Sequence, residues 1–515
     1  MLKWALGAGQ LALLDRMGLL RSGVAHANTT DTPSKLCVIY VPGGFRPQYH
    51  FWPMADEDVE HCVPEPGGFA GEPTYFRKES LVDLGPANGN FKPIRVWRSW
   101  DPANPANRTG FSPMMYGFQH FDLAGQMAVL HGVDQGTADH NSAFVSAMCG
   151  VASPDFRAPA FHSVFANHVH GRYASTRPLP FVTVTTDRGI PVAQGLPSHA
   201  APVKVPSVEA LGPQMSDDPM LNGWWDKLNV RRPAPELDVR GGDLGSMLSA
   251  TALETHTIKQ PGKLLGRSTQ KVDGFLEGLH GSLRSVSRVL AADVVSVLEN
   301  QKGIDALTMK PSYMANYGLG PFGYTFGNAN FHMTQMEPRL DMALRLLKSD
   351  LTSAVHVAFP LDFDTHSGLG HAFSCAHGRA QMDVVARFLG ELKATAAPGL
   401  PGKTLLDDTL VVVLSEFGRS WASKGSTGFN LPDDHHPYTS VLFAGGGVAG
   451  NRSIGTYDRR GLGLATDIIE ENGQPSSRVP RSADVAATAM RMMGLDLHEF
   501  FIPGGYGEVV GLRKT

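Results

Sequence analysis

The sequence predicts an α/β protein in which helices cover both faces of a mostly parallel central sheet. Short apolar runs rich in β-branched residues recur along the chain, and helical patterns lie between several of them. These runs are continuously apolar rather than alternating, which is typical of strands buried on both faces. With 515 residues, the chain can bury about 75% of the surface that it exposes when unfolded. A large core is therefore expected.

The apolar runs also set the positions of the predicted elements. Ligands of such sheets bind beyond the carboxyl ends of the strands, so the residues after each strand are the first candidates for a site. Strands are expected at 36–41, 127–130, 181–184, 354–359, 409–414 and 440–444, and helices at 272–298, 339–347, 382–392 and 483–493.

Composition and charge exclude some classes of function. The net charge is −4 and the pI is about 6.6, whereas a nucleic-acid-binding protein normally has a basic face and a high pI. No nucleic-acid partner is therefore expected. Among the cysteines, Cys37 and Cys149 lie in apolar runs and are interpreted as buried thiols, and the sequence assigns no disulfide.

Residues 1–27 have the features of an export signal. Lys3 is followed by an apolar stretch and then by an Ala-x-Ala pattern that ends at Ala27, typical of a cleavage site. Asp15 and Arg16 interrupt the apolar stretch, so no transmembrane anchor is predicted. The segment is similar to a twin-arginine signal without its arginine pair, and we expect the natural start to lie slightly upstream. A periplasmic or otherwise exported protein that meets the twin-arginine translocase is expected; an amphipathic first helix is the alternative.

Residues 28–515 are interpreted as a single α/β domain with two long insertions. The segments at about 52–112 and 187–266 are irregular in pattern, and the first is rich in Pro, Gly, Asn and aromatic residues. Long loops in compact domains are often functional, and disorder is the alternative.

A carboxylate and an imidazole follow the predicted strand at 354–359. Asp364 and His366 are two residues apart, so in an extended segment both side chains point to the same side. Such a pair suits a divalent metal at a strand end. The alternative is a turn in which Asp364 caps the next helix, because Asp-x-His alone is a weak motif.

The predicted strand at 409–414 is followed by the sequence SEFGR. Glu416 thus also lies just past a carboxyl end, and Gly418 is expected to allow a sharp backbone turn. Arg419 is predicted either to hold an anionic substrate in a bidentate grip or to form an ordinary ion pair with Glu416.

The strongest single cluster of potential metal ligands precedes the predicted strand at 440–444. Two carboxylates and two imidazoles stand side by side in DDHHP, which begins at Asp433. This density of nitrogen and oxygen donors is typical of a metal site, with Asp434 and His435 as candidate ligands. A solvated polar loop is the alternative.

A helix is expected to begin shortly after the predicted strand at 127–130. The intervening sequence HGVDQGTADHNS leads into an apolar helical run. A helix N-terminus attracts anions through its N–H groups and its dipole, so a phosphate or sulfate is expected beside Asp139, His140 and Asn141. Helix capping by Asp139, Asn141 or Ser142 is the alternative, and the two interpretations are compatible.

With these segments, the chain resembles an exported bacterial family known as domain of unknown function 1501. The resemblance is clear from about Ala354 to the C-terminus and looser, in the same order, back to Leu36. That family is similar to a branch of the alkaline phosphatase–sulfatase superfamily, which implies an alkaline phosphatase-like fold. The matching stretches are FDTHSG from Phe363, LLDDTLVVVLSEFGRS from Leu405, DDHHP from Asp433 and FAGGGVAG from Phe443.

The resemblance implies a metal-dependent hydrolase whose ligands come from three motifs. Asp364 and His366 match the Asp/His pair, Glu416 the acidic residue at a strand end, and His435 the later histidine. No acid follows the first strand, so one metal ion is expected rather than two. Thr137 and Ser142 are the hydroxyls at the position of the superfamily nucleophile, and neither lies in a recognisable nucleophile motif.

The sequence is compatible with two functions. The first is an exported metal-dependent hydrolase of phosphate or sulfate esters, with zinc, manganese or calcium bound and a small anionic ester as substrate. Arg419, His140 and the helix N-terminus would hold the anion, and Thr137 is a candidate nucleophile. The alternative is a non-catalytic exported scaffold or binding protein on a degenerate alkaline phosphatase-like fold. No oligomeric state is predicted.

Overall fold

A computed structural model of the chain defines the positions of many, but not all, of its residues. The predicted export signal, the Asp364–His366 pair and most of the two insertions lie outside the described residues. Side chains are described for 32–47, 115, 117–118, 121–151, 159–173, 176–184, 197, 200–205, 294, 296–304, 336–359, 381–420, 434–458, 460–496 and 505–514, and the backbone alone for 54–55, 81–83, 94–97, 295, 323–335 and 370–380.

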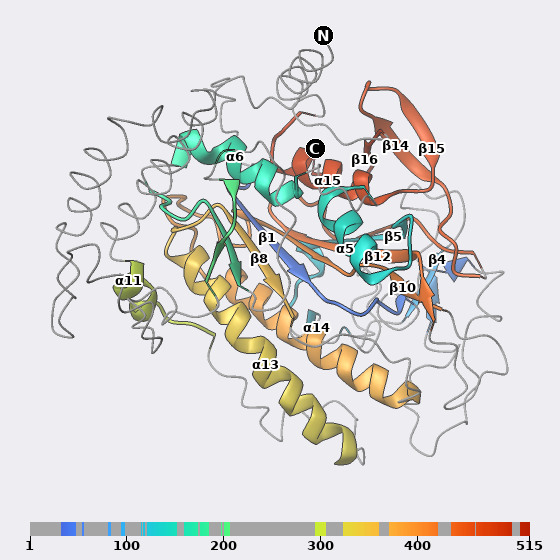
Figure 1. Cartoon of the computed structure of the whole chain (residues 1–515), viewed down its shortest axis with the longest axis horizontal. Helices are drawn as coiled ribbons and strands as arrows, with labels where there is room; N and C mark the ends of the chain where they lie inside the picture. The colour runs from blue at the N-terminus through green and yellow to red at the C-terminus, as the bar shows by residue number, and fades with distance from the viewer. Residues whose placement is uncertain are drawn as a thin grey trace, which may run out of the picture.

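An eight-stranded sheet with the order β13-β5-β12-β9-β1-β8-β6-β7 forms the centre of the molecule (Figure 1). β12 runs antiparallel to both of its neighbours, and the other pairings are parallel, so the predicted mostly parallel sheet is confirmed. Each run predicted as a strand is one. The strands are β1 (Lys35–Tyr40), β5 (Met127–Asp134), β6 (Phe181–Val184), β7 (Val203–Lys204), β8 (Ala354–Ala358), β9 (Thr409–Leu414), β12 (Tyr438–Gly445) and β13 (Arg452–Ile454).

Both faces of the sheet are buried, and alternating residues of β1 enter two different cores. Val38 and Tyr40 pack with α5 (His140–Cys149), α6 (Phe161–Tyr173) and α15 (Ser482–Met492). Cys37 and Ile39 pack on the opposite face with α11 (Val294–Asn300), α13 (Gly323–Lys348) and α14 (Gly370–Ala394). Figure 1 shows α13 and α14 on one side of the sheet and α5, α6 and α15 on the other. The predicted cover of helices on both faces is confirmed, as are the buried thiols of Cys37 and Cys149.

Some elements differ from the prediction in length or kind. α13 begins well before the predicted helix at 339–347 and contains Pro338 within it, although a proline usually marks a helix start or break. Of the helix predicted at 272–298, only its last residues are described, in α11. In the irregular segment at 52–112, β2 (Met54–Ala55), β3 (Leu81–Asp83) and β4 (Ile94–Trp97) pair as a small antiparallel sheet.

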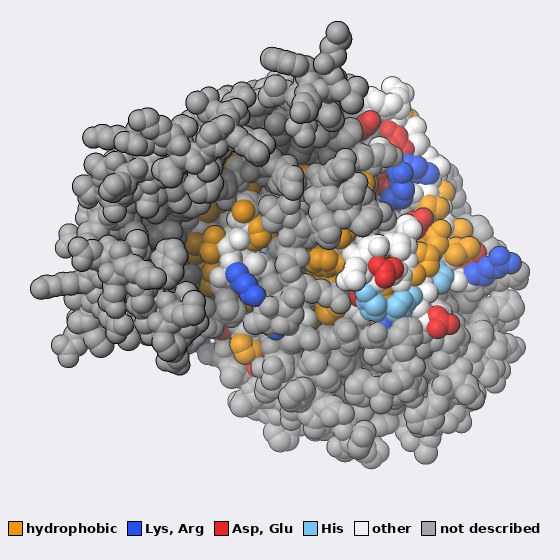
Figure 2. Space-filling view, viewed as in Figure 1, with side chains coloured by type: hydrophobic (Ala, Val, Ile, Leu, Met, Phe, Trp, Pro, Cys, Tyr) orange, Lys and Arg blue, Asp and Glu red, His pale blue; other side chains and the backbone are white. Residues whose placement is uncertain are grey.

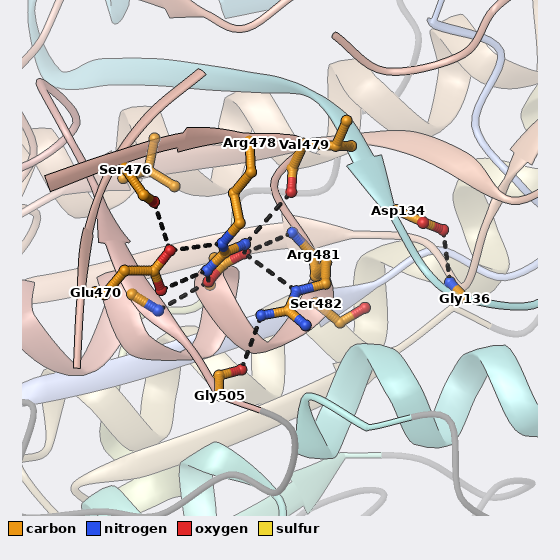
Figure 3. A network of polar contacts seen from close by, with 12 residues as sticks. Asp134, Gly136, Glu470, Ser476, Arg478, Val479, Arg481, Ser482 and Gly505 are labelled. Carbon is orange, nitrogen blue, oxygen red and sulfur yellow. Dashed lines mark hydrogen bonds and ion pairs between the residues drawn. The ribbon is translucent and has the colours of Figure 1, made fainter. Parts of the chain in front are cut away.

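A second antiparallel sheet, β14 (Thr466–Glu470), β15 (Pro475–Arg478) and β16 (Gly507–Val509), is joined to α15 by Arg478 (Figure 3). The Arg478 guanidinium lies 2.7 Å from Glu470 and 2.6 Å from the buried Asp484 on α15. Just after Arg478, the Pro480 carbonyl accepts the N–H of Asp134 at 2.8 Å. The network therefore also holds the carboxyl end of β5.

The described helices include none that is long and apolar enough to cross a membrane.

Among the described residues, three histidine side chains are fully buried. His131 bonds to Ser440 at 3.0 Å and to Ser453 at 2.7 Å, and His162 bonds to His356 at 3.1 Å. Burial lowers the pKa of His131 from its ordinary 6.5 to about 3. Above pH 6.5 the ring is neutral in the folded and the unfolded chain. As the pH falls below 6.5, the unfolded chain binds a proton that the folded chain does not, so stability is lost.

We predict that His131→Asn makes stability less dependent on pH. Between pH 7.5 and 5.5, His131 lowers the unfolding free energy by about 1.4 kcal/mol, because one pH unit separates 5.5 from the unfolded pKa. The variant should lack this part of the loss in urea denaturation at the two pH values. His168→Asn, at an exposed position of α6, is the control and should behave as the wild type does. An unchanged difference in His131→Asn would contradict the prediction.

Candidate functional site

Loops from opposite ends of the sequence meet at one edge of the central sheet. Because β12 is antiparallel, Tyr438 at its start pairs with Asp134 at the end of β5. Residues 434–437 of the DDHHP segment, just before β12, therefore reach the edge where β1, β5 and β9 have their carboxyl ends. Here β10 (Gly418–Arg419) pairs with β11 (His435–His436). Figure 2 shows histidine side chains gathered at the surface near the position of β10 in Figure 1.

Glu416 is the buried centre of this edge. Its Oε1 accepts the N–H of Gly43 at 2.8 Å and lies 2.8 Å from Nδ1 of His140, and its Oε2 accepts the hydroxyl of Ser415 at 2.9 Å. Burial raises the pKa of this carboxyl, but the hydrogen bonds from His140, Gly43 and Ser415 outweigh burial and lower the pKa below its ordinary value. The carboxylate thus joins the loops after β1 and β9 to the start of α5.

His140 is the first residue of α5 and lies between Glu416 and the surface. Its side chain is 24% exposed, whereas that of Glu416 is 0% exposed. The His140 ring meets the half-buried ring of His435 edge-on, with centroids 4.5 Å apart. Phe417 packs against both imidazoles, at 4.8 Å from His140 and 4.4 Å from His435. The two histidines come from segments almost 300 residues apart in the chain and share one aromatic support.

The Arg419 side chain is buried beside Phe417 rather than exposed at the surface. It is fully buried, its Nε donates to the Gly43 carbonyl at 2.7 Å, and its guanidinium carbon lies 5.5 Å from the centroid of the Phe417 ring. The Gly43 N–H in turn donates to Glu416. The loop after β1 is therefore held by a cation on one side and by a carboxylate on the other.

The glycines after β1 are a part of the site that the sequence analysis did not assign. Gly43 and Gly44 have φ values of 96° and 88°, which favour glycine. A Cβ on Gly44 would also lie 2.8 Å from the Phe417 ring. The loop after β1 has this glycine pair and no acidic residue, and the backbone N–H of Gly43 donates to Glu416. A Gly-Gly pair shortly after a buried strand, with only Val41 and Pro42 between them, was the available signal.

Gly418 has a different role from the expected sharp turn. Its φ lies outside the left-handed region, and a Cβ there would overlap the Tyr438 carbonyl oxygen. Glycine is needed because the backbones of β10 and β12 approach closely.

Three further predicted site residues, Asp139, Thr137 and Asp434, lie in the loops around this edge. Asp139 is the N-cap of α5 and accepts the Ser142 N–H at 2.9 Å, which confirms the capping prediction. The Thr137 hydroxyl accepts the Asp139 N–H at 3.2 Å. Asp434 is exposed, and its backbone carbonyl accepts the Ser420 N–H at 2.9 Å.

The donors in the described part of this edge suit a metal ion chemically, although they do not complete a site. Within the described residues there is no group of three or more His, Cys, Asp or Glu side chains arranged to hold a metal ion. His140 and His435 provide neighbouring imidazoles, and a carboxylate behind an imidazole is common where histidine binds zinc. Asp364 and His366 lie outside the described residues.

The architecture and this edge define an α/β protein with a polar site at the carboxyl ends of its strands. Residues 311–509 match the model of a family described as a protein of unknown function (DUF1501). The matched range includes Glu416 and His435, whereas His140 and Gly43 precede it. No curated protein matches the chain. The comparisons therefore support a family of unknown function for this part of the chain.

We predict that Gly418→Ala destabilises the protein by about 1–3 kcal/mol, because the added methyl group overlaps the β12 backbone and forces a shift. Denaturant unfolding measures this change. Gly125→Ala is the matched control, since a Cβ at Gly125 meets no atom within 4 Å, and its effect should stay within about 0.5 kcal/mol. Equal stability of the two variants would contradict the close approach of β10 and β12.

Proposed function

We propose that the protein is an exported metal-dependent hydrolase of phosphate or sulfate esters. One observation carries the proposal. Glu416, His140 and His435 belong to three separate segments of the sequence, and the fold brings all three together at the carboxyl edge of the sheet. Sites of open α/β sheets lie at this edge.

The predicted ligands of the metal are Asp364, His366 and His435, with Glu416 and Asp434 as further acidic candidates. One divalent ion, zinc, manganese or calcium, is proposed. When bound, such an ion polarises an ester oxygen and activates water or a hydroxyl group for attack. An alkaline phosphatase-like fold, export by the twin-arginine translocase and a periplasmic location are parts of the same proposal.

The chain's own residues would bind and orient the ester anion. The start of α5, whose first residue is His140, offers backbone N–H groups and a helix dipole that favour negative charge. The buried Arg419 side chain adds positive charge behind the loop after β1, because it donates a hydrogen bond to the Gly43 carbonyl of that loop. Thr137 is the proposed hydroxyl nucleophile, three residues before His140 in the same loop.

A non-catalytic scaffold or binding protein is the second candidate. It is favoured by the contacts of Glu416 and Arg419, which tie loops of the protein together, and by the absence of an acid in Pro42-Gly43-Gly44.

Metal content and turnover test the proposal together. Protein beginning at Asn28 is purified, and its bound metal is measured by mass spectrometry. Hydrolysis is assayed with p-nitrophenyl phosphate, bis-p-nitrophenyl phosphate and p-nitrophenyl sulfate. We expect about one divalent ion per chain and turnover of at least one ester.

The variant Asp364→Ala/His366→Ala/His435→Ala should lose both the metal and the turnover. The control Glu299→Ala/His168→Ala changes exposed positions of α11 and α6 and should keep both. A folded wild type that binds none of the three metals and hydrolyses none of the esters would favour the scaffold.

A further inference from the structure

We propose that Glu416 is a positioning residue for His140, and that the His140 imidazole, rather than the Glu416 carboxylate, faces the metal beside His435. The metal part of this inference rests on the proposed function. The pairing of Glu416 with His140 stands independently of it.

Hydrogen-bond donors already occupy both oxygens of the Glu416 carboxylate. Oε1 receives both the Gly43 N–H and His140, and Oε2 receives the Ser415 hydroxyl. A carboxylate offers about four lone-pair positions, and donors already use most of them in a fully buried site. These donors leave one position, on Oε2. Because the carboxylate is 0% exposed behind His140, an ion at the surface would reach Oε1 only by displacing that ring, and disrupting a buried hydrogen bond in this way is costly.

The contact with Glu416 also sets the tautomer of His140. An ionised carboxylate can only accept hydrogen bonds, so Nδ1 of His140 must carry the hydrogen in their 2.8 Å contact. In the neutral ring, Nε2 then carries the lone pair. Metal-binding histidines usually donate their other N–H to a carboxylate or a carbonyl group in this way, which fixes the ring and makes it a stronger ligand.

His140 is also closer to the surface and to His435 than Glu416 is. Glu416 is sealed at 0% exposure, while His140 stands in front of it at 24% exposure and touches the ring of His435. The His140 imidazole thus extends from the buried carboxylate toward His435, the predicted metal ligand. The described hydrogen bonds of Glu416 go to Gly43, His140 and Ser415. Phe417 supports both rings, so the pair is held in one arrangement before any ion binds.

Nuclear magnetic resonance of ¹⁵N-histidine-labelled protein tests the pairing without metal. The His140 signal is identified as the one that disappears in His140→Gln. We expect a protonated Nδ1 in the wild type and in Ser415→Ala, the control that removes a different donor from the same carboxylate. In Glu416→Gln the Nδ1–H should move upfield, because a neutral acceptor binds it more weakly. A protonated Nε2 in the wild type, or an unmoved signal in Glu416→Gln, would overturn the pairing.

Zinc affinity in a double-mutant cycle tests how Glu416 acts. If it acts only through His140, Glu416→Gln should weaken Zn²⁺ binding about 10–100-fold in the wild type. The same change should have an effect of no more than about twofold in the His140→Gln background. A full effect of Glu416→Gln in that background would identify Glu416 as a direct ligand and overturn the inference, as would unchanged zinc affinity in either single variant.

The two measurements separate this inference from the proposed function. Failure of the wild type to bind zinc, manganese or calcium, with the Nδ1–H tautomer as expected, would overturn the metal role of His140 together with the metallohydrolase. The positioning of His140 by Glu416 would remain supported. Tight zinc binding without the expected tautomer or coupling would overturn only the inference, because the hydrolase could use other ligands.

Discussion

The carboxylate of Glu416 is the constraint on which the edge of the sheet depends. A buried negative charge is tolerated only when donors surround it, and here the donors come from the loop after β1, from Ser415 beside it and from the start of α5. Burying this group therefore requires these segments to meet. The positions of His140 and of the Gly43 peptide follow from that requirement, and Arg419 completes it by binding the other side of the Gly43 peptide.

The reversed direction of β12 is the second feature that builds the site. A segment that precedes a parallel strand would lie at the amino edge, far from the ends of β1 and β9. Since β12 is antiparallel, the His435 loop enters the carboxyl edge, and the Pro437 carbonyl accepts the Gln135 N–H at 3.0 Å beside the loop that leads to His140. The close approach at Gly418 and the network around Arg478 hold this arrangement from two sides.

The sequence alone predicts the elements well and the contacts between them poorly. Continuous apolar runs locate the strands because a strand buried on both faces must be apolar throughout. The capping of α5 by Asp139 is also local and can be predicted. The direction of β12 leaves no such signal, and the bond between His140 and Glu416 joins residues 276 positions apart. Pro338 lies within α13, although the local preference of proline predicts a break in the helix there. At this position tertiary packing overrides the local preference.

Crystals grown with zinc and measured at the zinc absorption edge would test the central claim most directly. The account predicts one anomalous peak within about 2.0–2.1 Å of Nε2 of His140 and of a ring nitrogen of His435, with the Glu416 carboxylate still bonded to Nδ1 of His140. A peak bonded to the Glu416 oxygens, a peak elsewhere in the protein, or no peak in zinc-soaked crystals would contradict it.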